Sequence, residues 1–110
     1  MKGKVDMKEI IKKKVKEIFE GKGIDVLKII LFGSRARGDY KEDSDWDILI
    51  IVRSDLNTQE KREIAKTIRK VLAEMFIPSD IIIKSQKETE YYKNFPGSVT
   101  REALKEGIEI

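Results

Sequence analysis

The sequence contains no histidine and no cysteine, and these two absences exclude several classes of active site. Without cysteine the chain forms no disulfide and offers no thiol nucleophile, so nothing in it points to secretion. Without histidine it has neither an imidazole base nor an imidazole ligand for zinc. Any catalysis must therefore rest on carboxylates, lysine, arginine, tyrosine or hydroxyl groups.

Long apolar runs are also missing from the 110 residues. No stretch approaches the roughly 20 apolar residues that a membrane-spanning helix needs, and the first residues alternate lysine with apolar side chains. We therefore expect a cytoplasmic protein without a membrane partner. What is present, 40% hydrophobic and 39% charged residues, is the balance of a globular domain with an ionic surface. We expect residues 1–110 to form a single domain.

The spacing of apolar residues predicts an α/β (α+β) protein in which helices and short strands are mixed. This order of elements favours a small mixed β-sheet with helices packed on one face. The predicted elements are a helix over 7–20, a strand over 26–32, a helical turn after Ser34, a strand over 47–52, a long helix between Asn57 and Pro78, a strand over 80–83, a short helix near 88–93, and a last helix from Ser98 to Gly107 with residues 108–110 trailing.

Lysines crowd the first predicted helix, whereas the net charge of the whole chain is only +3. No aromatic residues alternate with these lysines, as they do on many surfaces that bind single-stranded nucleic acid. We interpret the lysines as the solvated face of an amphipathic helix, and nucleic acid is not the favoured partner. The lysines are Lys2, Lys4, Lys8, Lys12, Lys13, Lys14 and Lys16.

A glycine–serine pair follows the first predicted strand. Gly33 has no Cβ, so a phosphate can approach its backbone amide closely. The hydroxyl and amide groups at Ser34 can hold phosphate oxygens. Arg35 and Arg37 can offset the charge of a triphosphate, or they can pair with acidic residues of the following loop. The pair therefore indicates a nucleotide phosphate site.

Ten residues later an Asp-x-Asp sequence begins the second predicted strand. Asp45 and Asp47 are two residues apart on a strand, so their carboxylates point to the same face, while Trp46 points to the other face. Paired carboxylates suit Mg²⁺, and two such ions can clamp the α-phosphate of a nucleotide. Asp80 opens the next predicted strand, where it can supply a third carboxylate and accept the proton of an acceptor hydroxyl.

These residues resemble the signature of the nucleotidyltransferase superfamily that includes DNA polymerase β and kanamycin nucleotidyltransferase. That signature is Gly-Ser, ten residues, then Asp-x-Asp, matched here by Gly33, Ser34, Asp45 and Asp47. The extended form Gly-Ser-Arg-Ala-Arg-Gly is similar to the minimal nucleotidyltransferases (MNT) of prokaryotes. The resemblance implies ATP as substrate, two Mg²⁺ ions held by Asp45 and Asp47, and Asp80 as the third acidic position.

The resemblance also implies an acceptor. Members of the minimal family act as antitoxins paired with a helical HEPN-domain ribonuclease toxin, and they add AMP to a tyrosine of that toxin. We expect the same activity and partner here. Two alternatives stay open at the level of sequence: transfer to a small molecule or an RNA end, and a binding module that neutralises a toxin by contact alone. The sequence leaves the oligomeric state open.

Overall fold

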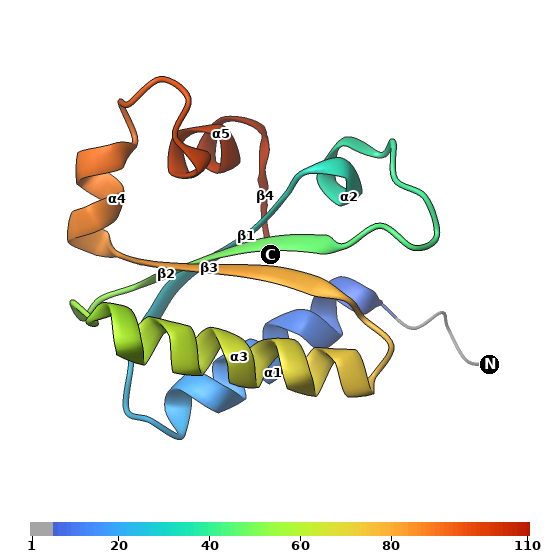
Figure 1. Cartoon of the computed structure of the whole chain (residues 1–110), viewed down its shortest axis with the longest axis horizontal. Coiled ribbons are helices and arrows are strands. Elements are labelled where there is room, and N and C mark those ends of the chain that lie inside the picture. The colour runs from blue at the N-terminus through green and yellow to red at the C-terminus, as the bar shows by residue number, and fades with distance from the viewer. Residues whose placement is uncertain (1–5) are drawn as a thin grey trace.

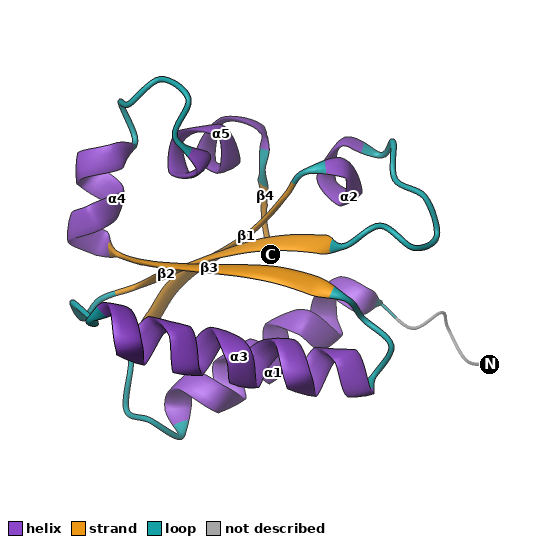
Figure 2. Ribbon diagram, in the orientation of Figure 1, coloured by secondary structure: helices purple, strands orange, loops and turns teal. Residues whose placement is uncertain are grey.

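The computed structural model describes residues 6–110 as a mixed α/β fold with five helices and four strands. Figure 1 and Figure 2 show the strands forming one layer between the two long helices and the short C-terminal ones. The elements are α1 Met7–Glu20, β1 Val26–Phe32, α2 Ser34–Arg37, β2 Trp46–Val52, α3 Thr58–Glu74, β3 Ser79–Ser85, α4 Gln86–Tyr92, α5 Val99–Glu106 and β4 Ile108–Glu109. Lys2 and Lys4 of the lysine-rich segment lie outside the described residues.

The sheet has the strand order β3-β2-β1-β4 and mixes both kinds of pairing. β1 is antiparallel to β2 and to β4, whereas β2 and β3 are parallel. The antiparallel register places Phe32, at the end of β1, opposite Asp47. The parallel register places Asp47 opposite Asp80. The end of β1 and the starts of β2 and β3 therefore meet at one edge of the fold.

The two long helices cover one face of the sheet, as the sequence predicted. Ile11, Val15 and Phe19 of α1 are fully buried there, together with Ile68 and Leu72 of α3. These residues recur at intervals of four, which keeps them on one side of each helix. Alternate β2 residues complete this core, because successive side chains of a strand point to opposite faces.

The short C-terminal helices lie on the other side of the sheet, so the expectation of helices on one face holds for α1 and α3 alone (Figure 1). Ala103 of α5 packs there with Ile30, Leu49 and Ile51 in a second, smaller core. The sequence pattern missed this layer because one buried alanine gives a short helix little apolar periodicity.

The end of α3 also differs from the prediction, which had Pro78 stopping the helix. The helix ends at Glu74, and Phe76 takes a left-handed conformation with φ 62°. The amides of Phe76 and Ile77 donate to the carbonyls of Ala73 and Leu72, which is the hydrogen-bond pattern of a Schellman cap. A backbone motif that glycine usually forms therefore ends the helix before the proline is reached.

Residues 108–110, predicted to trail, instead contribute the short strand β4. Ile108 pairs with Leu31 and Glu109 pairs with Ile30. Strand β4 fixes the C-terminal end of α5 beside the end of β1, where the glycine–serine pair follows. Among the residues that the structure describes, no helix combines the length and apolar character needed to cross a bilayer.

Candidate nucleotide and metal site

Gly33 and Asp47 touch at the edge where β1 ends and β2 begins. Gly33 is buried with φ 74°, a conformation that side chains rarely adopt. A methyl group built on its Cα would overlap the Asp47 carboxylate. The Asp47 side chain therefore faces the glycine–serine turn, and only glycine at position 33 leaves room for it.

Asp80 lies beside Asp47 on the same face of the sheet. The two residues are direct partners in the parallel ladder, so their backbones are about 4.8 Å apart. The apolar neighbours confirm the face, because Ile81 and Ile83 join the core under α1 and α3 while Ile82 packs on the opposite side. Asp80 shares the side of Ile82, and that side is also the one that Asp47 faces.

The electrostatics of Asp47 reflect this crowding. Partial burial raises the pKa of the Asp47 carboxyl above its ordinary value, and the negative charges of Asp80 and Asp45 raise it further. Arg37 opposes the shift, whereas Glu106 adds to it. Asp45 itself is exposed, at the end of the loop that precedes β2. The site therefore gathers negative charge, which favours the binding of cations.

Three aspartates are a suitable donor set for Mg²⁺, which prefers a few carboxylate oxygens and completes its shell with phosphate and water. As they stand, no three acidic side chains within residues 6–110 are arranged closely enough to hold a metal ion. Asp45 and Asp80 are exposed, so their side chains are free to rotate toward Asp47. The residues fit the ions chemically, and the metal ligands stay a prediction.

The two predicted phosphate arginines lie apart from each other. The Arg37 guanidinium lies near the carboxylates, 3.3 Å from Asp39 and 3.5 Å from Glu106. Arg35 instead donates through Nε and Nη2 to the Ser44 carbonyl, at 3.2 and 3.0 Å. Its nucleotide contact stays a prediction, because its present partners belong to the loop that carries Asp45.

Aromatic rings hold Arg35 in that position. Its guanidinium carbon lies 4.3 Å from the centre of the Tyr40 ring and 4.7 Å from the centre of the Trp46 ring. Trp46 points away from Asp47, as expected from strand alternation, and is partly buried against the core under α1. Arg35 thus ties the loop end at Ser44 to the start of β2.

Glu106 is the site residue that sequence reasoning missed. Its Oε2 accepts a hydrogen bond of 3.3 Å from the amide of Gly33, although 73 positions separate the two residues. No motif marks Glu106, since it reaches the site only through the pairing of β4 with β1. The neighbouring Gly107 gives a faint signal, because a side chain there would collide with the Leu31 backbone and the Ile30 side chain.

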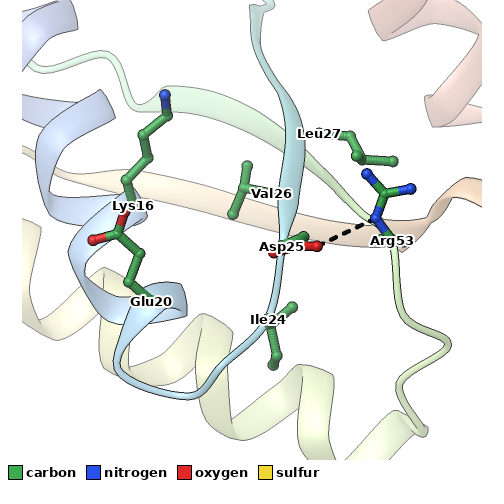
Figure 3. A pocket seen from close by; sticks show the side chains of 7 residues that line it. All are labelled: Lys16, Glu20, Ile24, Asp25, Val26, Leu27 and Arg53. Atoms are coloured by element: carbon green, nitrogen blue, oxygen red, sulfur yellow. Dashed lines mark hydrogen bonds and ion pairs between the residues drawn. The ribbon is translucent and has the colours of Figure 1, made fainter.

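Figure 3 shows a pocket away from these residues, lined in part by the start of β1. It has a volume of about 280 Å³ and includes Lys16, Val26 and an exposed ion pair of 3.3 Å between Arg53 and Asp25. Leu27, the lining residue nearest to the turn along β1, comes six positions before Gly33. That is roughly 20 Å of extended chain, so this pocket is distinct from the candidate site.

The sequence profile of the nucleotidyltransferase domain family matches residues 8–110. The chain belongs to this nucleotidyltransferase family. Two candidate protein adenylyltransferases of Methanocaldococcus jannaschii are similar to it. MJ0141 is 35% identical over 93% of this chain and 96% of the relative. MJ0604 is 38% identical over 74% of this chain and 75% of the relative.

Solved structures of nucleotidyltransferases share the fold. A crystal structure of a toxin–antitoxin complex with AMP-PNP matches with a TM-score of 0.58 at 18% identity, covering 88% of this chain and 69% of the other. A structure of a tri-AMPylated Shewanella oneidensis HEPN toxin in complex with its MNT antitoxin matches with a TM-score of 0.56 at 16% identity, covering 92% and 69%. The family match and the relatives identify this chain as a nucleotidyltransferase enzyme.

Proposed function

We propose that this nucleotidyltransferase moves AMP from ATP onto a tyrosine hydroxyl of a HEPN-domain toxin and thereby acts as its antitoxin. The observation that carries the proposal is the contact of Asp47 with Gly33, with Asp80 directly alongside. It brings the turn that we propose to bind phosphate next to the carboxylates that we propose to bind metal ions. The similarity to candidate protein adenylyltransferases and to an MNT antitoxin bound to an AMPylated HEPN toxin supports a protein acceptor.

In this proposal each part of the site has one task. The Gly33–Ser34 turn and Arg37 hold phosphate oxygens of ATP, and Arg35 is a further candidate for that contact. Asp45, Asp47 and Asp80 hold two Mg²⁺ ions. When bound, the ions neutralise phosphate charge and lower the pKa of the attacking hydroxyl. Asp80, which is exposed at the start of β3, takes the hydroxyl proton in this proposal.

The reaction balances as a simple displacement. The tyrosine oxygen forms a bond to the α-phosphorus of ATP. At the same time the bond breaks between that phosphorus and the oxygen that links the α- and β-phosphates. Pyrophosphate leaves, and the hydroxyl proton passes to a carboxylate or to water. The toxin must present its tyrosine at the edge where β1 ends and β2 and β3 begin.

The test is transfer of label from α-labelled ATP to a purified HEPN toxin from the same genome, with Mg²⁺ present. The wild-type chain should label the toxin, and the Asp45→Asn/Asp47→Asn double variant should not. The control is Asp43→Asn with Asp55→Asn, which also removes two carboxylate charges, in this case from exposed loops, and leaves the cluster intact. No label with any divalent cation contradicts the proposal.

The same variants separate catalysis from the alternatives. If Asp45→Asn/Asp47→Asn still neutralises the toxin fully in cells, contact rather than transfer is the function. If label appears on RNA or on a small molecule instead of the toxin, the enzyme has another acceptor.

A further inference from the structure

The Glu106 carboxylate accepts a hydrogen bond from the Gly33 amide, which the proposed nucleotide would also need. Its Oε2 lies 3.3 Å from the Gly33 nitrogen and 3.5 Å from Nη1 of Arg37. Both groups are donors assigned above to ATP phosphate. We propose that Glu106 fills this anion position in the nucleotide-free enzyme, so that a nucleoside triphosphate binds by displacing it. The proposal rests on the proposed function, because it needs the triphosphate to use the same amide.

The contacts of Glu106 are weak enough to be exchanged. An amide hydrogen bond of 3.3 Å is longer than the usual 2.9 to 3.0 Å. The ion pair with Arg37 is partly exposed, and Arg37 also pairs with Asp39 at 3.3 Å. Such exposed pairs contribute little net stability. The charge of Glu106 is moreover repelled by that of Asp47.

The backbone next to Glu106 is fixed, so only the side chain can leave. A methyl group on Gly107 would collide with the Ala103 carbonyl and the Ile30 side chain, which shows how closely the chain passes β1 here. The next residues, Ile108 and Glu109, are paired with β1. Displacement is therefore a rotation of one side chain, while α5 and β4 stay in place.

This arrangement makes Glu106 a determinant of nucleotide affinity. A triphosphate replaces the lost carboxylate contacts with hydrogen bonds and ion pairs of its own, which its larger negative charge makes stronger. A ligand without phosphates gains nothing from the vacated amide and arginine. Glu106 should therefore lower the affinity for ATP and leave the affinity for adenosine unchanged.

Calorimetric titration with a non-hydrolysable ATP analogue and Mg²⁺ tests the inference on the full chain. Glu106→Ala removes the competing carboxylate, and Glu106→Gln removes its charge but keeps an oxygen that can accept from Gly33. We expect affinity for the analogue to rise about three- to tenfold in Glu106→Ala and less in Glu106→Gln. Glu102→Ala, exposed one turn earlier on α5, is the control and should match the wild type.

Unchanged or weaker binding of the analogue by Glu106→Ala, with an unaltered melting temperature, overturns the inference, because Glu106 then does not compete with phosphate. An equal gain for adenosine overturns it too, since the effect would not concern phosphate. The toxin-labelling assay reports separately on the proposed function. If the wild type labels the toxin while Glu106→Ala binds the analogue no better, the function stands and this inference fails.

Discussion

Replacing Gly33 with alanine tests the contact that joins the phosphate turn to the carboxylates. The new methyl group meets two obstacles. The backbone at Gly33 has φ 74° and ψ −157°, a region populated almost only by glycine. The methyl group also overlaps the Asp47 carboxylate. Gly38 provides the matched control, because it has φ 91° but nothing within 4 Å of an added Cβ.

The two variants should differ by the cost of the overlap and by the difference between their two backbone regions. Left-handed backbone costs an alanine about 1–2 kcal/mol, which is the loss of unfolding free energy expected for Gly38→Ala. Gly33→Ala should lose about 1–3 kcal/mol of unfolding free energy through its backbone conformation and about 1–3 kcal/mol more through overpacking against Asp47. Moving a reacting group by about 1 Å can cost about 100-fold in rate. We therefore expect transfer to fall about 100-fold in Gly33→Ala and to stay near wild type in Gly38→Ala.

Urea denaturation and toxin labelling, both run well below the melting temperature of either variant, measure these effects. A third variant isolates the contact. In the Asp47→Ala background the overlap is absent, so Gly33→Ala should destabilise the protein by at least about 1 kcal/mol less than it does in the wild type. If Gly33→Ala lowers the free energy of unfolding equally in both backgrounds, Asp47 does not lie against Gly33 in solution. The same conclusion follows if the Gly33→Ala single variant transfers AMP as well as Gly38→Ala does.

The remaining predictions concern charge, loop position and backbone strain. The raised pKa of Asp47 means that its ionised form opposes folding, so Asp47→Asn should raise the melting temperature at pH 7. This gain should vanish near pH 3, which is below the ordinary aspartate pKa of about 3.9. Equal gains at both pH values would contradict the prediction. Arg35→Ala should raise the Mg²⁺ concentration needed for half-maximal transfer about tenfold, because it frees the loop that ends at Asp45. Arg35→Lys should restore part of the loss. An unchanged Mg²⁺ requirement would show that Arg35 does not anchor this loop for catalysis. Phe76→Gly should raise the free energy of unfolding in urea by about 1 kcal/mol, since it relieves a left-handed phenylalanine that is 90% exposed; a loss of stability would refute the strain.

Local patterns in the sequence were sufficient for most of the fold. The first helix begins and ends where the period of its apolar residues placed it, and the first strand matches the mostly apolar run that Gly33 ends. Asn57 and Ser98, the residues from which the sequence begins the long helix and the last helix, cap these helices, since such caps depend only on neighbouring residues. Phe76 lies beyond this reasoning, because a left-handed phenylalanine goes against its own conformational preference.

The candidate site divides in the same way. Gly33 and Asp47 were predicted to share a site because they match the signature of Gly-Ser, ten residues and Asp-x-Asp, and the structure brings them into contact. The contact of Glu106 with Gly33 depends on the pairing of β4, a two-residue strand that has no detectable pattern of its own. The position of the Arg35 guanidinium depends on its contacts with the rings of Tyr40 and Trp46, and the spacing of residues in the sequence does not reveal these contacts.

Charge connects the two proposals made here. Asp45, Asp80 and Glu106 all add negative charge around Asp47, and Arg37 opposes them with positive charge. The pKa of Arg37 is itself raised mainly by its hydrogen bond with Asp39. A triphosphate alone would meet this negative field and be repelled. Divalent cations held by the aspartates would reverse the local charge, and the arriving phosphates could then replace Glu106 on the Gly33 amide. If both proposals hold, the arrangement favours the metal-bound triphosphate over the free one, and nucleotide affinity depends on the same carboxylates that we propose for the transfer reaction.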